Sequence, residues 1–251
     1  MKPVPDHYRG VWARRLLETP QICDESTFVR WLQTSVWHAD VRIPSERPGV
    51  DAQTQLANQQ GFCGVTHVEQ QTQGDVCTWH RRFDFQPPRA DVDAGVMVFE
   101  IPERVIETGV HASYLEIWDR LPGSTGRFIA LARLDETGRD TRERFFVAGQ
   151  YAMHVRPRLT DWPRDTQDGQ TLSGVLARYP GMAQELLDFE ISFGMLDAGH
   201  WVIERSTLPA LQGVSLAFAV RQLDYTQAAI DSPFYSGYWQ ILEWSTNATR
   251  L

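Results

Sequence analysis

The stretch Leu121-Pro122-Gly123-Ser124-Thr125-Gly126 lies at the middle of the 251-residue chain and divides it into two halves. Proline and glycine in close succession interrupt strands and helices, so we expect a turn here. Short segments rich in Val, Ile, Phe, Tyr and Trp lie on both sides of it, which is typical of strands. The sequence therefore predicts two β units in tandem, over residues 1–122 and 123–251.

The two halves also resemble each other. The first half ends in Tyr114-Leu115-Glu116-Ile117-Trp118, and the second ends in Tyr238-Trp239-Gln240-Ile241-Leu242-Glu243-Trp244. An earlier pair, residues 37–42 and residues 151–156, matches loosely. Helical patterns are scarce and predict only two short helices, near residues 52–60 and 171–178. A tandem repeat of this kind restricts the fold strongly and the chemistry much less.

Composition excludes several classes of function. Hydrophobic residues make up 42% and charged residues 22% of the chain, which is typical of a globular protein. The formal charge of −8 argues against nucleic acid as the main partner, because binding to phosphates relies on a basic surface. No apolar run approaches the roughly 18 residues that span a bilayer, so we expect no membrane association. The N-terminal residues lack the apolar core of a secretory signal, which predicts a cytoplasmic protein.

Alternation along the strands indicates barrels more than a sandwich. In residues 77–86, one face carries Cys77, Trp79, Arg81, Phe83 and Phe85, and the other carries polar residues. Tyr114, Glu116, Trp118 and Arg120 likewise share a face. Large aromatic residues mixed with an isolated charge fit the lining of a ligand-holding barrel. The alternative is that Arg81 and Glu116 lie at strand ends or face water.

A family resemblance agrees with this interpretation. Ile106-Glu107-Thr108-Gly109-Val110, followed by Tyr114-Leu115-Glu116-Ile117-Trp118, resembles a stretch of the fungal HRI proteins, which are named for interacting with a casein kinase. Other segments align in the same order, among them residues 41–44, 60–64, 80–85, 147–151 and 239–244. The resemblance implies an all-β fold of two tandem antiparallel lipocalin-like (calycin) β-barrels with a few short helices. It implies no activity, and because the linkers differ, the kinase partner is not carried over.

Five residues form the candidate ligand site of the N-terminal barrel: Trp79, Arg81, Tyr114, Glu116 and Trp118. If they point inward, an Arg–Glu pair among indole rings would orient a small polar ligand. The same pair would serve equally well as a structural plug in a filled barrel. A desolvated Glu116 would have a raised pKa and could act as an acid.

An alternative acid–base cluster consists of His38, Asp40 and Arg42, which alternation places on one face. A His beside an Asp is a plausible general base, and an Arg nearby would hold an anion. The competing interpretation is an outward, solvated face with charge pairs between strands. The pattern Cys63, His67, Cys77, His80 suggests zinc only superficially, since Cys77 and His80 would point to opposite faces of a strand.

We therefore expect no resident metal and no cofactor. Gly-rich phosphate loops and a Gly-x-Ser-x-Gly nucleophile motif are absent from the sequence. The leading functional hypothesis is a protein that binds a small, partly apolar ligand in its N-terminal barrel. An enzyme that performs acid–base chemistry in that cavity, such as an isomerase, lyase or hydratase, is the alternative. A protein-interaction module without a ligand is a third hypothesis, and the sequence leaves the oligomeric state open.

Overall fold

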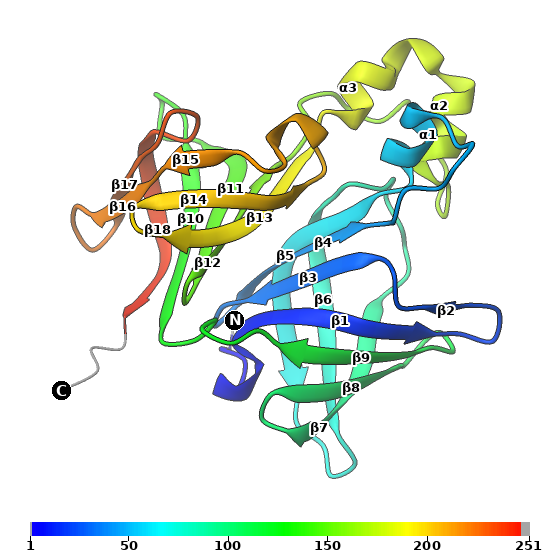
Figure 1. Ribbon diagram of the computed structural model, residues 1–251, viewed down its shortest axis with the longest axis horizontal. Helices are drawn as coiled ribbons and strands as arrows, with labels where there is room; N and C mark the ends of the chain where they lie inside the picture. The colour runs from blue at the N-terminus through cyan, green and yellow to red at the C-terminus, as the bar shows by residue number, and fades with distance from the viewer. Residues whose placement is uncertain (1, 247–251) are drawn as a thin grey trace.

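The computed structural model describes residues 2–246 and contains two antiparallel β-sheets side by side, with few short helices (Figure 1). The expected all-β fold is thus confirmed. The turn at residues 121–126 connects the last strand of the first sheet to the first strand of the second. No helix in the described part of the chain is both long and apolar enough to cross a membrane.

The first sheet closes into an eight-stranded barrel. Its strands are β1 (Gly10–Glu18), β3 (Phe28–Gln33), β4 (Trp37–Ile43), β5 (Gln60–Glu69), β6 (Asp75–Asp84), β7 (Asp93–Ile101), β8 (Arg104–Gly109) and β9 (Leu115–Arg120). Each strand pairs with the next one in the chain, and β9 returns to pair with β1. A short strand β2 (Cys23–Asp24) extends the sheet beside the end of β1. This up-and-down order is the one that lipocalins use.

The second sheet curls into a half-barrel. Its strands are β10 (Arg127–Leu134), β11 (Asp140–Ala148), β12 (Tyr151–Arg156), β13 (Glu190–Asp197), β14 (His200–Ser206), β15 (Ser215–Ala217), β16 (Ala219–Gln222), β17 (Gln227–Asp231) and β18 (Gly237–Thr246). The two edge strands, β15 and β16, are separated in the chain only by Phe218. The curl therefore brings both edges of the sheet to one bent segment.

The repeat seen in the sequence corresponds to a repeat in topology. Residues 37–42 and 151–156 lie in β4 and β12, and each of these is the third main strand of its sheet. The segments that end the two halves lie in β9 and β18, and each pairs with the first strand of its own sheet. Asp40 and His154 thus occupy matching positions in the two sheets, and both side chains are buried.

The two sheets share one apolar core. Val41 and Phe85 of the first half pack in one buried cluster with Phe189, Ile191 and Phe193 of the second. A Cβ atom on Gly61 would lie 2.5 Å from Ile191 Cδ1 and 2.7 Å from the Asp40 carbonyl oxygen, and because the latter belongs to the backbone, this contact requires a glycine. That residues 1–122 and 123–251 fold as separate domains stays a prediction. Each half by itself would expose the apolar surface that it buries against the other half.

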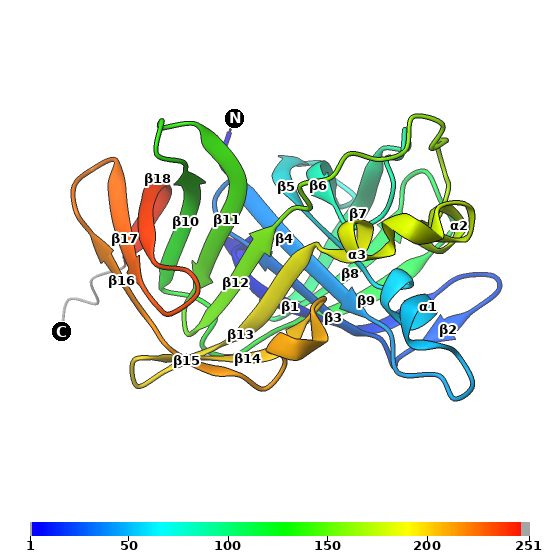
Figure 2. The ribbon, with the colours of Figure 1, turned by 90° about the horizontal axis from the view of Figure 1, so that it is seen from above.

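The helices gather at one end of the first barrel (Figure 2). They are α1 (Ala52–Ala57), α2 (Leu172–Arg178) and α3 (Ala183–Leu187), and the first two confirm the predicted helices. The excursion between β12 and β13 carries α2 and α3 from the second half to α1, where the Ser173 hydroxyl donates to Asn58. At the opposite end, the short helix η1 (Asp6–Tyr8) packs Tyr8 into the barrel interior. Tyr8 of η1 therefore fills one end of the barrel, and the helices and their connecting loops lie at the other end.

Candidate functional site

The interior of the first barrel holds a group of indole rings. Trp31 lies edge-on to Trp79, with ring centroids 5.5 Å apart, and edge-on to Trp118 at 5.9 Å. All three are buried. Above them, towards the end that carries the helices, lies a cavity of about 240 Å³. The five residues of the predicted ligand site, Trp79, Arg81, Tyr114, Glu116 and Trp118, all line this cavity.

Ion pairs surround the cavity. Arg14 donates to Glu116 at 2.9 Å and to Asp24 at 2.8 Å. Arg42 donates to Asp40 at 2.8 Å and lies 3.9 Å from Glu116. Burial opposes the charge of Arg42, but Asp40 and Glu116 outweigh it and raise the pKa of the guanidinium. The charge of Glu116 is thus balanced inside the barrel.

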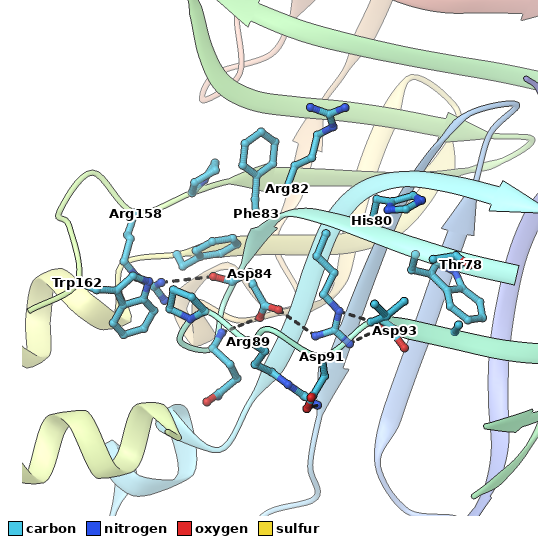
Figure 3. Close-up of a pocket in the computed structure, with 18 of the residues that line it drawn as sticks. Thr78, His80, Arg82, Phe83, Asp84, Arg89, Asp91, Asp93, Arg158 and Trp162 are labelled. Carbon is cyan, nitrogen blue, oxygen red and sulfur yellow. Dashed lines mark hydrogen bonds and ion pairs between the residues drawn. The ribbon is translucent and has the colours of Figure 1, made fainter. Parts of the chain in front are cut away.

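A second ion-pair group lies at the mouth of the cavity. The Arg81 guanidinium bridges Asp93, at 2.7 Å, and Asp84, at 2.9 Å, and both carboxylates are labelled in Figure 3. It also lies over the ring of Phe62, 3.8 Å from the centroid. Arg81 is therefore held in place on three sides at the entrance.

Glu107 is the residue that sequence reasoning missed. It lies on β8 directly opposite Glu116 of β9, and only 3% of it is exposed. Its carboxyl accepts hydrogen bonds from the Tyr114 hydroxyl at 2.6 Å and from Trp118 Nε1 at 3.1 Å. Among residues 2–246, no Arg, Lys or His lies within ion-pair distance of it. Burial, followed by the nearby charge of Glu116, raises the pKa of Glu107 well above its usual value.

The backbone opposite Glu107 is shaped to receive it. A Cβ atom on Gly95 would lie 2.6 Å from Glu107 Cγ and 2.7 Å from its Oε1 atom. The Glu107 side chain therefore lies flat across a glycine of β7. The sequence carried one signal for this placement. Val105, Glu107 and Gly109 alternate along one face of the strand, and Val105 is fully buried, so this face points inward.

The alternative cluster divides in the structure. His38, Asp40 and Arg42 share a face of β4, and this face points into the barrel instead of into solvent. Asp40 and Arg42 line the cavity, whereas His38 does not. Its Nδ1 lies 3.0 Å from the Thr66 hydroxyl, which itself donates to Gln33. Burial, helped by Arg81, lowers the pKa of His38 to about 3, so the ring is a neutral core residue.

The sequence predicts a single apolar face for residues 77–86, and this prediction is wrong for the part of the strand that follows Arg82. A β-bulge lies between β5 and β6, where Gly64 pairs with Arg81 and Cys63 pairs with Phe83. The extra residue, Arg82, reverses the alternation. Trp79 and Arg81 consequently face the cavity, while Phe83 and Phe85 join the core between the two sheets.

A larger cleft of about 720 Å³ adjoins the cavity. Residues 78–84 of β6 form one wall, and Arg158 and Trp162 of the excursion form another (Figure 3). Six residues line both spaces: Trp79, Arg81, Arg89, Asp93, Ala112 and Tyr114. The cleft and the cavity are therefore neighbouring spaces that share a wall.

The interior of the second barrel is built differently. Its apolar core contains Phe145, Trp201 and Trp239. His154 lies between two carboxylates, 2.8 Å from Glu143 and 3.0 Å from Glu190. Burial alone would lower the pKa of His154, but the two carboxylates raise it to about 9. The buried carboxylates Glu143 and Glu190 are thus paired with a cation of the protein itself, His154.

The cysteines and histidines do not assemble into a metal site. Cys63 belongs to the core between the sheets, whereas Cys77 lies inside the first barrel. Within residues 2–246 there is no group of three or more His, Cys, Asp or Glu side chains placed to hold a metal ion. The three cysteines are free thiols.

Comparison with known proteins adds a likeness in fold. No family model and no curated protein matches the chain. Among solved structures, the chain is similar to the uncharacterised protein YLR301w of Saccharomyces cerevisiae, with a TM-score of 0.62 and 14% sequence identity. The match covers 94% of this chain and 99% of the yeast protein. At this identity the likeness concerns the fold alone, and it extends over both halves of the chain.

Proposed function

We propose that the protein binds a small ligand in the cavity of its first barrel. The observation that carries this proposal is the cavity itself, which brings together aromatic walls and charged groups in a barrel otherwise filled by side chains. Ligand sites are commonly apolar pockets with a few well-placed polar groups. At about 240 Å³ the cavity lies below the usual range of roughly 300–1,000 Å³ for drug-sized ligands, so the ligand is small.

The polar lining supports a binding role more than a structural plug. In a plug, every charge would be balanced by a neighbour, as Arg14 balances Glu116. Glu107 accepts from two neutral donors, Tyr114 and Trp118, and has no ion-pair partner among residues 2–246, so its carboxyl remains available to a guest. We also propose that the chain is related to the calycins and the fungal HRI proteins. The up-and-down order of strands in the first barrel supports this relationship. A cytoplasmic location stays a prediction.

Blocking the entrance tests the proposal. Ala112 is exposed and lines both the cavity and the cleft, so Ala112→Trp should close the route without disturbing the core. The matched control is Ala210→Trp, at an exposed position of the second half. Native mass spectrometry of the freshly purified proteins should show a small molecule bound to the wild type and to the control, and none bound to Ala112→Trp. Equal occupancy of all three would place the ligand elsewhere, and a wild type without any bound molecule would count against the proposal.

The carboxyl pair Glu107 and Glu116 favours acid–base catalysis as a second candidate function. Two carboxyls whose environments push their pKa values apart can act as acid and base on one substrate. Glu107, whose pKa is raised, would donate the proton, and Glu116 lies beside it in an ion pair with Arg14. Conversion of the molecule found in the cavity by the wild type, and not by Glu107→Gln, would establish this function; release of that molecule unchanged by both would oppose it.

A further inference from the structure

The acids around the cavity outnumber the bases. Three guanidinium groups line it, those of Arg42, Arg81 and Arg89, and each already pairs with a carboxylate. Four carboxyl groups line it as well: Asp40, Asp93, Glu107 and Glu116. Asp40, Asp93 and Glu116 each pair with an arginine, whereas Glu107 has no ion-pair partner among residues 2–246. The lining therefore offers one acid that would accept a positive charge from a ligand.

We propose that the ligand is a small organic ammonium ion, whose charged nitrogen binds the Glu107 carboxylate in the cavity lined by Trp31, Trp79 and Trp118. This inference rests on the proposed function, because it requires a ligand in the cavity. The faces of indole rings attract cations, and aromatic cages recognise ammonium groups in many proteins. Tyr114 and Trp118 fix the carboxyl so that it lies on the cavity wall.

The second barrel shows how this chain satisfies buried acids. Glu190 accepts hydrogen bonds from the Tyr235 hydroxyl at 2.8 Å and from Ser192 at 2.7 Å, and it also has His154 as a cation. Glu107 has the corresponding neutral donors, a tyrosine and an indole, but no cation of the described chain forms an ion pair with it. A bound ammonium group would supply the part that His154 supplies in the second barrel.

Binding would be coupled to proton release. Because the pKa of Glu107 is raised, the free protein keeps this proton to a higher pH than an exposed glutamate does. A bound ammonium ion would replace the proton, which leaves to solvent while the ligand keeps its own. The titratable and charged groups that face Glu107 are Glu116, Asp93, Arg42, Tyr114, Cys77 and Tyr8. Arg42 and Glu116 are already engaged in ion pairs, which leaves Glu107 as the group that changes charge.

Benzylamine and its neutral analogue benzyl alcohol test this inference on the full chain. Titration calorimetry should show benzylamine binding at least about tenfold more tightly than benzyl alcohol. Above the ordinary pKa of a glutamate, the Kd of benzylamine should fall as pH rises, by about tenfold for each pH unit over which Glu107 stays protonated in the free protein. Calorimetry in buffers of different ionisation enthalpy should register one proton released per benzylamine bound.

Glu107→Gln should remove the preference for the amine over the alcohol and the pH dependence of amine binding. The control is Glu136→Gln, in an exposed turn of the second half, which should behave as the wild type. Equal binding of alcohol and amine, or an unaltered preference in Glu107→Gln, would overturn the ammonium inference and leave the binding function standing. Failure of both compounds to bind would also overturn it, whereas the binding function itself is judged by native mass spectrometry of the purified protein.

Discussion

Replacing Glu107 with Gln should make the protein more stable at neutral pH. An unfolded Glu ionises near pH 4.3, whereas the folded protein holds the pKa of Glu107 well above that value. As pH rises through this window the unfolded state loses its proton and the folded state keeps it, so wild-type stability falls. The loss is about 1.4 kcal/mol for each pH unit that lies between the unfolded and the folded pKa. The amide does not titrate, so the variant escapes this loss.

The Gln side chain should fit the site, because it resembles a protonated carboxyl. Its carbonyl oxygen can accept from Trp118 Nε1, and its amide can donate to the Tyr114 hydroxyl. Urea unfolding of the two proteins, followed by tryptophan fluorescence from about pH 5 to about pH 8, gives the difference in unfolding free energy at each pH. Glu136→Gln should show no such trend. A difference between wild type and Glu107→Gln that does not change with pH would refute the reasoning, since Glu107 would then be ionised in the folded protein.

Other substitutions test the rest of the account. His154→Gln should flatten the dependence of stability on pH in the alkaline range. Because the pKa of His154 is raised to about 9, its contribution to stability is complete below about pH 6.5 and disappears as pH rises through 9, a loss of about 3 kcal/mol. Urea unfolding measures this loss, and an unchanged slope in the variant would contradict the prediction. Trp118→Ala should cost about 3–5 kcal/mol, since the ring is 2% exposed, and an unaltered midpoint would be inconsistent with its burial. Gly95→Ala should displace Glu107 and cost about 1–3 kcal/mol in thermal unfolding, whereas Gly181→Ala, with no atom within 4 Å of its added Cβ, should be neutral.

Local patterns in the sequence were sufficient for the architecture. The Pro-Gly turn at residues 121–126 and the matching ends of the two halves predicted two tandem β units, and the short helices near 52–60 and 171–178 were found. Closure of the first sheet required a pairing between β1 and β9, which lie at opposite ends of the first half. No local pattern encodes such a pairing, but the repeat made it plausible.

The candidate site was predictable only in part. Alternation placed Tyr114, Glu116 and Trp118 on one face, and all three line the cavity. Alternation failed at Arg82, because a single inserted residue reverses the faces and one sequence does not reveal a bulge. Glu107 was overlooked because an isolated glutamate in a strand looks like a solvated residue. Its significance comes from having no ion-pair partner within residues 2–246, which is a property of three-dimensional arrangement.

The most direct test of the central claim is a crystal structure of the protein as purified, with attention to the space between Trp79, Glu107 and Trp118. The account predicts electron density for a small molecule in the cavity, in contact with the indole rings and with a polar group within hydrogen-bonding distance of the Glu107 carboxyl. A cavity closed by these side chains, with the Glu107 carboxyl paired to an arginine of the protein, would contradict it.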